Sequence, residues 1–290
     1  MILVTGGTGT IGQHVVRELL ARGAEFRVAA RDTAKVTELL GPEIGSVPFD
    51  YNDVASIRRA FESSRTVFLL HPGGSNGRHQ ATAAIDVARE VGVQRIVLQS
   101  AFGADDQPGY SLARFHREVE LYLLASGLTG TVLRPNSFFE NLIKFLGDSI
   151  KTEGKFYLPL GDARVSYIAA RDVGAVAASV LVSEGYENQS YDLTGPEAVS
   201  GAELADALSR ATGRTIEYVD VTEDAVRETL QGASEEAVEG ILGLYAYDRS
   251  GATARVTGTV EEISGRPPQD VRAWAIENAD ALTPSVTAPA

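Results

Sequence analysis

Three features of the sequence predict an α/β protein with a doubly wound parallel sheet. Short apolar stretches alternate with amphipathic segments of helical length up to Pro135. The first apolar stretch, ILVT, runs directly into the glycine-rich segment GGTGTIG, and an aromatic-rich segment begins after Pro135. Strands that alternate with helices of about ten to fifteen residues form βαβ units, and right-handed crossovers wind such units into a doubly wound sheet.

The expected strands are short apolar runs that end at a glycine or a polar residue. Such runs are typical of parallel strands, because helices cover both faces of a parallel sheet and exclude water from its side chains. The expected strands are residues 2–5, 26–31, 46–50, 66–70, 95–100, 131–135 and 191–195.

The expected helices carry apolar residues three and four positions apart, which places these residues on one face. In the first helix Val15, Val16 and Leu19 have this spacing, and Gly23 ends the helix. The expected helices are residues 12–23, 32–40, 52–64, 79–92 and 111–127.

The chain is long enough for two lobes. We expect a nucleotide-binding domain of residues 1–135 and 165–195, and a smaller, mostly helical C-terminal substrate lobe of residues 136–164 and 196–278. The tail of residues 279–290 ends in small and polar residues with prolines, so we expect it to be disordered.

The composition excludes several classes of partner and site. Acidic residues outnumber basic ones by 39 to 26, and the net charge of −13 repels nucleic acid and anionic membranes. The sequence has no cysteine and its four histidines lack the spacing of metal ligands, so we expect no metal site. We see neither a signal peptide nor an apolar run near the ~20 residues that span a bilayer. We therefore expect a cytoplasmic protein that is a monomer or a homodimer.

Gly6, Gly9 and Gly12 form the pattern G-x-x-G-x-x-G between the first strand and the first helix. Gly6 permits a tight turn, Gly9 lets the backbone approach a pyrophosphate, and Gly12 lets the helix pack closely on the strand. The free N–H groups at Thr10 and Ile11 then face the phosphates. We infer a Rossmann-type domain that binds a dinucleotide; the alternative is a glycine-rich turn without a ligand.

The end of the second strand indicates which dinucleotide is bound. An Asp or Glu there would bind the ribose hydroxyls and repel a 2′-phosphate, but this strand ends in Arg31, with Lys35 one helical turn later. Because a guanidinium pairs well with phosphate, we expect NADP, with NADPH preferred over NADH. Asp32 follows at once and weakens this prediction, and the alternative is a solvated Arg and Lys on a surface helix.

Two further polar segments follow the third and fourth strands. Asp50 closes the third strand, where it either accepts a hydrogen bond from the adenine amino group or caps the next helix. The segment HPGG, which begins with His71 and Pro72, follows the fourth strand at a point where the chain must pass close to the ribose. Its glycines suit this approach, although a simple loop explains them nearly as well.

The motifs TGGTGTIG, LLHPGG, LQSAFGAD, LRPNSFFEN, RDVGAVAA, YDLTGPEAVS and EEISGRPP occur in this order. In this series the chain resembles the NmrA-like branch of the atypical short-chain dehydrogenases over about residues 1–275. It looks most like the quinone-reductase and triphenylmethane-dye-reductase subgroup. The resemblance implies NADPH binding by a Rossmann domain and a substrate cleft formed by the smaller lobe. Some members reduce quinones, dyes or ketones, and others bind the nucleotide without reducing anything.

The resemblance also implies roles for single residues. The dinucleotide contacts that it implies are Gly6, Thr10, Ile11, Arg31, Asp50, His71 and Ser100, with Pro135, Asn136 and Phe138 at the nicotinamide end.

The residues for proton transfer depart from the family pattern. Short-chain dehydrogenases usually carry Tyr-x-x-x-Lys on the helix after the fifth strand, whereas this chain has Tyr110 and Arg114. A guanidinium cannot reproduce the ammonium that lowers the tyrosine pKa and holds the ribose. Tyr110 is therefore either the general acid or an aromatic residue that lines the cleft. Ser100 either supports the substrate oxygen or only ends the strand.

His116 is the stronger catalytic candidate. It lies where related reductases carry Lys or His, and Glu120 follows four residues later on the same helical face. His116 can hydrogen-bond the nicotinamide ribose or relay a proton, with Glu120 orienting or charging its ring. The alternative is a half-buried histidine that Glu120 or a carbonyl satisfies.

Aromatic residues are the candidates for a substrate wall, although aromatic residues at such spacings are more often core. The expected substrate contacts are Phe102, Tyr110, Phe138 and Phe139, and further candidates are Phe145, Tyr157 and Tyr245. These residues favour an NADPH-dependent reductase of a small aromatic quinone or ketone. The alternative, which the missing Tyr–Lys pair motivates, is a non-catalytic NADP-sensing regulator that binds a protein partner.

Overall fold

The computed structural model describes residues 1–74, 76–106 and 110–284, which form two compact units. The first unit contains residues 1–135, 170–193 and 259–266, and the second contains residues 136–169, 194–258 and 267–284. The expected domains differ from these units mainly at residues 259–266, which pack with the first unit through helix α11 (Thr259–Ser264) and helix α7 (Ala170–Val182).

The first unit is built on a seven-stranded sheet in which every pair of neighbours is parallel. The strand order is β3-β2-β1-β4-β5-β6-β9. The strands are β1 (Ile2–Thr5), β2 (Phe26–Ala30), β3 (Ser46–Pro48), β4 (Thr66–Leu69), β5 (Arg95–Gln99), β6 (Thr129–Pro135) and β9 (Gln189–Leu193). The expected doubly wound α/β fold is therefore confirmed.

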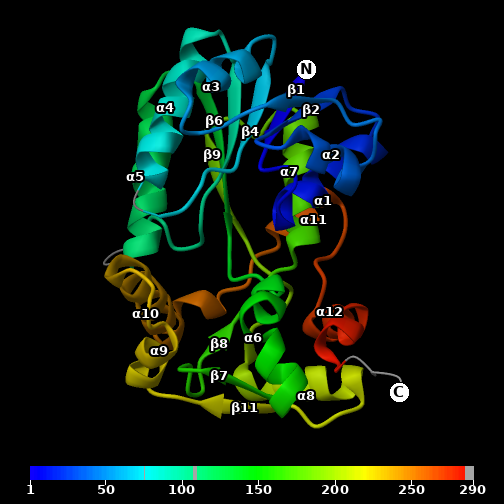
Figure 1. Cartoon of the computed structure of the whole chain (residues 1–290), viewed down its shortest axis with the longest axis vertical. Coiled ribbons are helices and arrows are strands. Elements are labelled where there is room, and N and C mark those ends of the chain that lie inside the picture. Colours follow the sequence, from blue (N-terminus) through cyan, green and yellow to red (C-terminus); the bar gives the residue numbers. More distant parts are fainter. Residues whose placement is uncertain (75, 107–109, 285–290) are drawn as a thin grey trace. The chain divides into compact units, whose positions relative to one another are not determined.

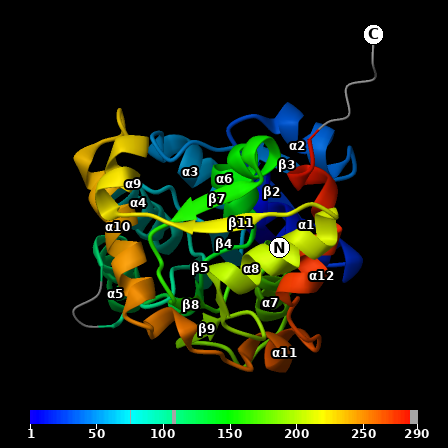
Figure 2. The same cartoon turned by 90° about the horizontal axis from the view of Figure 1, so that it is seen from below.

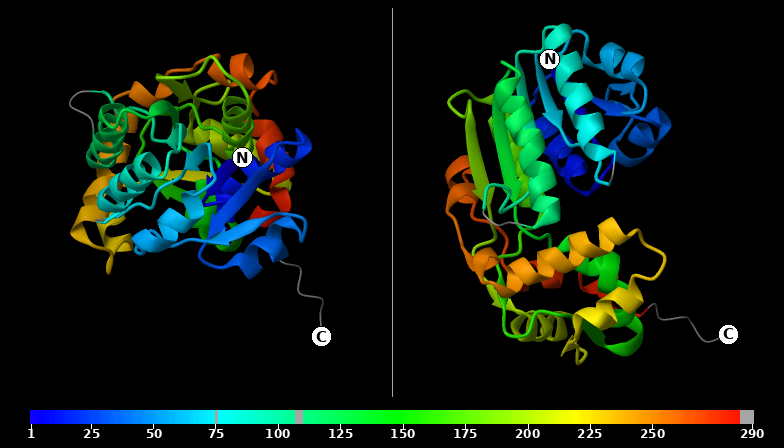
Figure 3. Two further views of the ribbon diagram at one scale, coloured as in Figure 1. Left: turned by 90° about the horizontal axis from the view of Figure 1, so that it is seen from above. Right: turned by 90° about the vertical axis from the view of Figure 1, so that its left-hand side faces the viewer.

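Helices cover both faces of this sheet, and its central strands β1 and β4 are buried along their whole length. The other helices of the unit are α1 (Thr10–Ala21), α2 (Thr33–Leu40), α3 (Val54–Phe61), α4 (Gly77–Glu90) and α5 (Ser111–Ala125). Figure 1 shows α3, α4 and α5 along one side of the sheet and α1 and α7 along the other. In the right-hand view of Figure 3, α4 in cyan and α5 in green run side by side. Leu3, Val67, Ile96 and Leu98 are fully buried in the core beneath them.

The strand order reverses between β1 and β4, which lie next to each other in the sheet. In open α/β sheets of this kind, ligands bind in the crevice outside the carboxyl ends of the strands at such a reversal. The turn after β1 and the segments after β2, β4 and β5 all lie at this edge of the sheet. They carry most of the residues that the sequence singles out.

The second unit has two small sheets surrounded by helices. Strands β8 (Arg164–Val165) and β10 (Val199–Ser200) are antiparallel, whereas β7 (Lys155–Leu158) and β11 (Glu217–Asp220) are parallel. Figure 2 shows β7 and β11 side by side, with α8 next to them. The helices are α6 (Glu140–Glu153), α8 (Gly201–Thr212), α9 (Glu223–Thr229), α10 (Glu235–Arg249), α12 (Val271–Glu277) and the 3₁₀ helices η1 (Ala252–Ala254) and η2 (Ala279–Leu282).

The end of the chain differs from the expectation of a disordered tail. The helix η2 occupies the first residues of the tail, and Leu282 is fully buried in the core of the second unit. Residues 285–290 lie outside the described residues. No helix within residues 1–74, 76–106 and 110–284 combines the length and the apolar character that crossing a bilayer requires.

Candidate dinucleotide site

The turn between β1 and α1 has the geometry of an anion cradle. Gly6 has a φ of +65°, which L-residues with a Cβ rarely adopt, and its carbonyl accepts a hydrogen bond from the Gly9 N–H at 2.9 Å. Gly9 is the N-cap of α1 and carries no side chain to cap the helix. The neighbouring helices α2 and α3, in contrast, begin at Asp32 and Asp53, whose carboxylates accept backbone N–H groups. The first N–H groups of α1 therefore have no side-chain cap and are available to an anion.

Two glycines in this turn leave no room for a side chain. A Cβ on Gly12 would lie 2.1 Å from the carbonyl oxygen of Gly6, and a Cβ on Gly7 would lie 2.6 Å from Cγ1 of Val28 on β2. At Gly9 a Cβ would meet only the Gly6 oxygen, at 3.2 Å. The helix and the turn thus approach each other so closely that only glycine fits, as the pattern predicts.

Arg31 and Lys35 lie at the end of β2 and in the first turn of α2, and both side chains are exposed. Among the residues that the structure describes, neither forms an ion pair with a carboxylate. Asp32 accepts hydrogen bonds from the N–H groups of Ala34 and Lys35, so its carboxylate is turned to the start of α2. Asp32 is therefore the N-cap of α2, and its carboxylate counts less against the prediction of NADP.

Asp50 shapes a turn rather than capping a helix. Its Oδ1 accepts the backbone N–H of Asn52 at 2.9 Å and the Asn52 amide at 3.2 Å, while Asp53 is the N-cap of α3. The helix-capping alternative for Asp50 is therefore wrong. The adenine contact stays a prediction.

His71, two residues after β4, and His116, in the N-terminal half of α5, lie close together. Their ring centroids are 5.1 Å apart, and the ring of Phe115 lies 5.2 Å from His71. His71 Nδ1 lies 3.1 Å from the Pro72 carbonyl oxygen, which only accepts, so Nδ1 carries the proton. The neutral ring then presents Nε2 as an acceptor, and this buried atom has no partner among the described residues. Gly77 makes the packing possible, because a Cβ there would lie 2.3 Å from the Pro72 oxygen.

The expected orientation of His116 by Glu120 is wrong. Glu120 is fully buried and bonds to other residues, and the buried Nδ1 of His116 has no partner in the described part of the chain. Burial, and secondarily the neighbouring His71, lower the pKa of His116 to about 3. Burial also lowers the pKa of His71. Both imidazoles are therefore neutral at pH 7.

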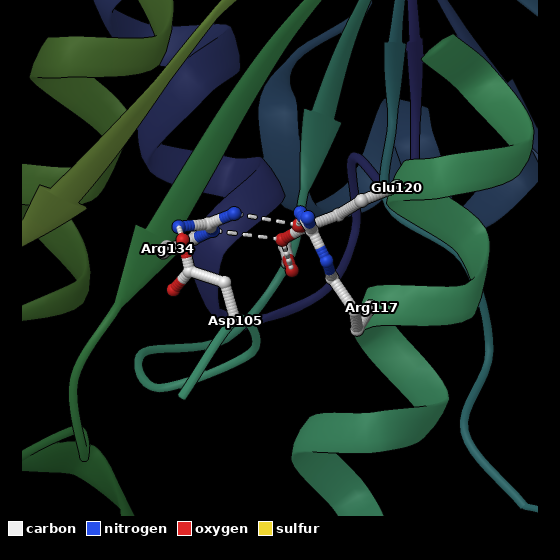
Figure 4. Close-up of polar contacts among 5 residues, drawn as sticks. Asp105, Arg117, Glu120 and Arg134 are labelled. Carbon is white, nitrogen blue, oxygen red and sulfur yellow. Dashed lines mark hydrogen bonds and ion pairs between the residues drawn. The ribbon is translucent and has the colours of Figure 1, made fainter. Parts of the chain in front are cut away.

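Glu120 is the centre of a buried ionic network (Figure 4). Arg134 binds it in a bidentate manner, with Nε 2.9 Å from Oε1 and Nη2 2.7 Å from Oε2, and Arg117 Nη1 lies 2.9 Å from Oε2. The Ser100 hydroxyl donates to Oε1 at 2.5 Å. The third nitrogen of Arg134, Nη1, bonds to Asp105. The network joins α5, β6 and the loop that follows β5.

Tyr110 and Phe102 are both buried in the segment between β5 and α5. Tyr110 is the N-cap of α5, and its hydroxyl donates to the Phe102 carbonyl at 3.3 Å. The Phe102 N–H donates in turn to the carbonyl of Pro135 at 3.0 Å. Phe102 is 2% exposed and Tyr110 is 8% exposed, so both side chains lie mainly within the protein.

In the second unit the residues of the segment NSFF have structural partners. The Asn136 amide donates to Ser166 Oγ and to the Thr253 carbonyl at 2.8 and 2.9 Å, and its oxygen accepts the Ser137 N–H. Both amide hydrogens are thus used within the unit, which leaves little of this side chain for a nicotinamide contact. Phe138 is half-buried and forms a β-bridge with Ile168.

Phe139 is a core residue, which corrects its expected role as a substrate contact. It is 2% exposed, and its ring stacks at 5.6 Å on Tyr167 and at 5.1 Å on Trp274. Of the further aromatic candidates, Phe145 is largely exposed, Tyr157 bonds to Glu153, and Tyr245 is half-buried.

Asp248 on α10 makes the stability of the protein depend on pH. It is 3% exposed, and burial raises its pKa from the usual 3.8 to about 7. Between about pH 4 and 7 the folded protein holds this proton and the unfolded chain does not, so stability falls as pH rises through this window. We expect Asp248→Asn to remove this dependence and to gain up to about 4 kcal/mol over the wild type near pH 7.5, at about 1.4 kcal/mol per pKa unit.

Urea unfolding of both proteins at pH 4.5 and 7.5 checks this expectation. Asp162→Asn, which alters an exposed carboxyl, is the matched control and should unfold like the wild type. Parallel pH dependences for the wild type and Asp248→Asn would contradict the assignment.

Sequence reasoning missed Arg134, Phe115 and Gly7. The sequence did offer a reason to single out Arg134, because a charged residue inside the apolar strand TVLRP requires a buried partner. Nothing in the sequence singled out Phe115, since a phenylalanine on an amphipathic helix indicates only core packing. Gly7 was read as a spacer within the motif, yet a Cβ on Gly7 would lie closer to Val28 than a Cβ on Gly9 would lie to any neighbour.

The chain is similar to several reductases along almost its whole length. NAD(P)H azoreductase of Xenophilus azovorans is 35% identical over 284 residues, which cover 97% of this chain and 99% of that protein. The NADPH-dependent quinone oxidoreductase of Escherichia coli, solved with NADPH, has a TM-score of 0.87 at 25% identity and covers 96% of this chain and 99% of its own.

The triphenylmethane reductase of Citrobacter sp., solved with NADP(H), shares the fold with a TM-score of 0.83 at 22% identity, covering 96% of this chain and 100% of its own. The family model described as the NmrA-like family matches residues 1–259. Because this match spans most of the chain, and the azoreductase matches nearly all of it, the chain belongs to the NmrA-like family.

Proposed function

We propose that this chain is an NADPH-dependent reductase that transfers hydride to an aromatic quinone- or ketone-type small molecule without a Tyr–Lys pair. The observation that carries this proposal is the glycine turn before α1, which is uncapped and too narrow for a Cβ at Gly12. The names of the azoreductase and of the quinone oxidoreductase support the same cofactor and a similar class of acceptor.

Residues of the first unit fit the parts of the dinucleotide. The turn from Gly6 to Gly12 would hold the pyrophosphate, and the exposed cations Arg31 and Lys35 would hold the 2′-phosphate. The buried acceptor nitrogen of His71 fits a ribose hydroxyl, which would supply the missing donor. When bound, NADPH supplies the hydride, and the protein supplies orientation and exclusion of water.

The states of the three expected proton donors argue against general-acid catalysis by any of them. His116 is neutral at pH 7, because its pKa is lowered to about 3. The Ser100 proton is held by Glu120, and the Tyr110 proton is held by the Phe102 carbonyl. We therefore assign the second hydrogen to water or to an acidic phenol of the substrate, which suits electron-poor acceptors such as quinones.

The pH dependence of kcat/KM tests whether His116 transfers a proton. Since the ring stays neutral from pH 5 to 8, we expect the profiles of kcat/KM for the wild type and His116→Ala to have the same shape, with rates within about tenfold. Steady-state rates with one quinone across this range measure it. A limb near pH 6.5 that His116→Ala abolishes would show instead that the imidazole transfers a proton.

The preference for NADPH over NADH tests the role of Arg31 separately. Arg31→Ala removes a cation that pairs with no carboxylate of the described residues and that would bind the 2′-phosphate. We therefore expect KM for NADPH to rise roughly 10- to 100-fold while KM for NADH changes less than twofold. Arg89→Ala, which removes an exposed arginine of α4 paired with Asp86, is the control and should leave both constants unchanged. Equal losses with both cofactors would remove Arg31 from the 2′-phosphate site.

The proposed function itself is tested by oxidation of NADPH, followed at 340 nm, with a panel of quinones, azo dyes and polycyclic ketones. We expect steady turnover with at least one quinone or azo acceptor, and lower kcat/KM with NADH. Tight NADPH binding without turnover on any acceptor would overturn the reductase and favour the sensing regulator. No feature of the described residues favours that regulator, and the azoreductase relative argues against it.

A further inference from the structure

A cavity of about 730 Å³ lies in the first unit at the amino ends of its central strands, and we call it the amino-edge cavity. Its lining residues come from the starts of β1, β4, β5 and β6, from the turn before β2 and from the segment after α7. In Figure 1 this edge of the sheet lies next to the N-terminus. The glycine turn follows the carboxyl end of β1, so the cavity and the proposed dinucleotide site lie at opposite edges of one sheet. A volume of this size is typical of sites for small molecules.

One side of the cavity is a row of polar side chains that the strand register brings together. Thr66 at the start of β4 pairs with Arg95 at the start of β5, and Arg95 pairs with Thr129 at the start of β6. Residues paired in this way present their side chains on the same face of a parallel sheet. The Arg95 guanidinium donates to the carbonyls of Val180 and Ser183 at the end of α7, so the row faces this helix.

The two threonines of this row have hydrogen-bonding capacity that the protein does not use. Thr66 is 9% exposed, and its hydroxyl bonds to no other residue within the described ranges. Thr129 is half-buried, and its hydroxyl likewise bonds to none of the described residues. Both residues line the cavity, so a ligand there can reach them. Because buried polar groups are usually hydrogen-bonded, these two hydroxyls indicate a polar occupant.

The charged groups around the row carry both signs. Arg65, directly before β4, and Glu25, directly before β2, are exposed and form no ion pair in the part of the chain that the structure describes. Glu187 lies 3.6 Å from Arg95 Nη1, so these two groups neutralise each other. Glu184, in the segment after α7, adds another exposed carboxylate. A ligand that complements the cavity therefore carries an anionic group for Arg65 and a cationic group for the carboxylates.

We propose that the amino-edge cavity binds a small zwitterion of the α-amino acid class. Arg65 and the hydroxyls of Thr66 and Thr129 hold its carboxylate. Glu25 and Glu184 provide the carboxylates for its ammonium group. An anion without an ammonium group would be repelled by the two glutamates, and a cation without a carboxylate would be repelled by Arg65. The proposal goes beyond the proposed function, because the residues that line the cavity differ from those assigned to the dinucleotide.

Titration calorimetry of the full chain with a panel of α-amino acids tests the proposal. Excess NADP⁺ in each titration keeps the amino acids out of the dinucleotide site. We expect at least one amino acid to bind with a dissociation constant on the order of 1 mM or below. Its N-acetyl derivative, which lacks the ammonium group, and its amide, which lacks the carboxylate, should each bind about tenfold more weakly.

Three variants place the ligand in the cavity. Arg65→Ala and Glu25→Ala should each weaken the amino acid about tenfold. Arg65→Ala should leave the affinity for the amide unchanged, because this probe has no carboxylate to lose. Thr66→Val, which replaces the hydroxyl with a methyl group, should weaken the amino acid about fivefold and leave the stability of the unliganded protein unchanged. Arg59→Ala, at an exposed arginine of α3 paired with Asp53, is the matched control and should bind like the wild type.

The proposal fails in any of three cases. In the first, none of the amino acids binds at millimolar concentrations. In the second, the N-acetyl derivative or the amide binds as tightly as its parent, so that one charge is sufficient. In the third, Arg65→Ala binds the amino acid like the wild type, which places the ligand elsewhere. A separate titration with NADP⁺ alone tests the proposed function, so the two failures are distinguishable.

Discussion

Gly12→Ala is expected to abolish dinucleotide binding, with NADP⁺ affinity falling by a factor on the order of 100 or more. The added Cβ would lie 2.1 Å from the Gly6 oxygen and 2.7 Å from the Gly7 Cα, and both neighbours are backbone atoms that cannot rotate away. The turn must therefore move away from the start of α1, which disrupts the N–H groups that would hold the pyrophosphate. Overpacking of this kind also costs about 1–3 kcal/mol of stability.

Calorimetry with NADP⁺ and thermal unfolding measure the two effects separately. Gly45→Ala is the matched control, because a Cβ there would meet only Cβ of Arg27, at 3.9 Å. We expect the control to bind and unfold like the wild type. Wild-type affinity in Gly12→Ala would mean that the turn before α1 does not hold the nucleotide.

Arg134→Met is expected to destabilise the protein by about 3–5 kcal/mol, the usual result when one partner of a buried ion pair is removed. The guanidinium is 5% exposed and its partner Glu120 is fully buried, so the carboxylate would lose its bidentate partner and keep only Arg117 and the Ser100 hydroxyl. For a chain of this size the loss corresponds to a fall in Tm of roughly 10 °C.

A surface arginine with two acidic partners provides the control. Arg227 on α9 pairs with Glu235 and Glu239, and its side chain is 41% exposed, so Arg227→Met should cost less than about 1 kcal/mol. The double variant Arg134→Met, Glu120→Gln should recover part of the loss, because it removes the uncompensated charge. Equal effects of Arg134→Met and Arg227→Met would refute the structural role of the buried pair.

The fold could be predicted from the sequence because its signals are local. The central strands β1 and β4 are buried on both faces, so an apolar run such as ILVT marks them directly. The glycine pattern follows from steric contacts within seven residues, and the structure agrees at Gly6 and Gly12. The ends of the helices and strands were less certain. The expectation of a disordered tail was wrong at Leu282, because this residue meets its core neighbours only in the folded unit.

The candidate site could be predicted only in part. Arg31 and Asp32 are adjacent, and the sequence left open which of the two caps α2; in the structure Asp32 accepts the N–H groups at the start of α2. Glu120 was assigned to His116 because the two are one helical turn apart. Arg134, fourteen residues further along the chain, offers a bidentate partner that a neutral imidazole cannot match.

The sequence by itself determined the parallel sheet, the glycine turn at its carboxyl edge and the cations after β2, because these depend on neighbours along the chain. Only the tertiary structure decided the state of the polar groups. It places His71 and His116 together in one buried environment where both rings are neutral, and it directs the Ser100 hydroxyl to Glu120. Proton positions and pKa values depend on burial and on charges brought from distant segments, and both arise only when β5, α5 and β6 pack together.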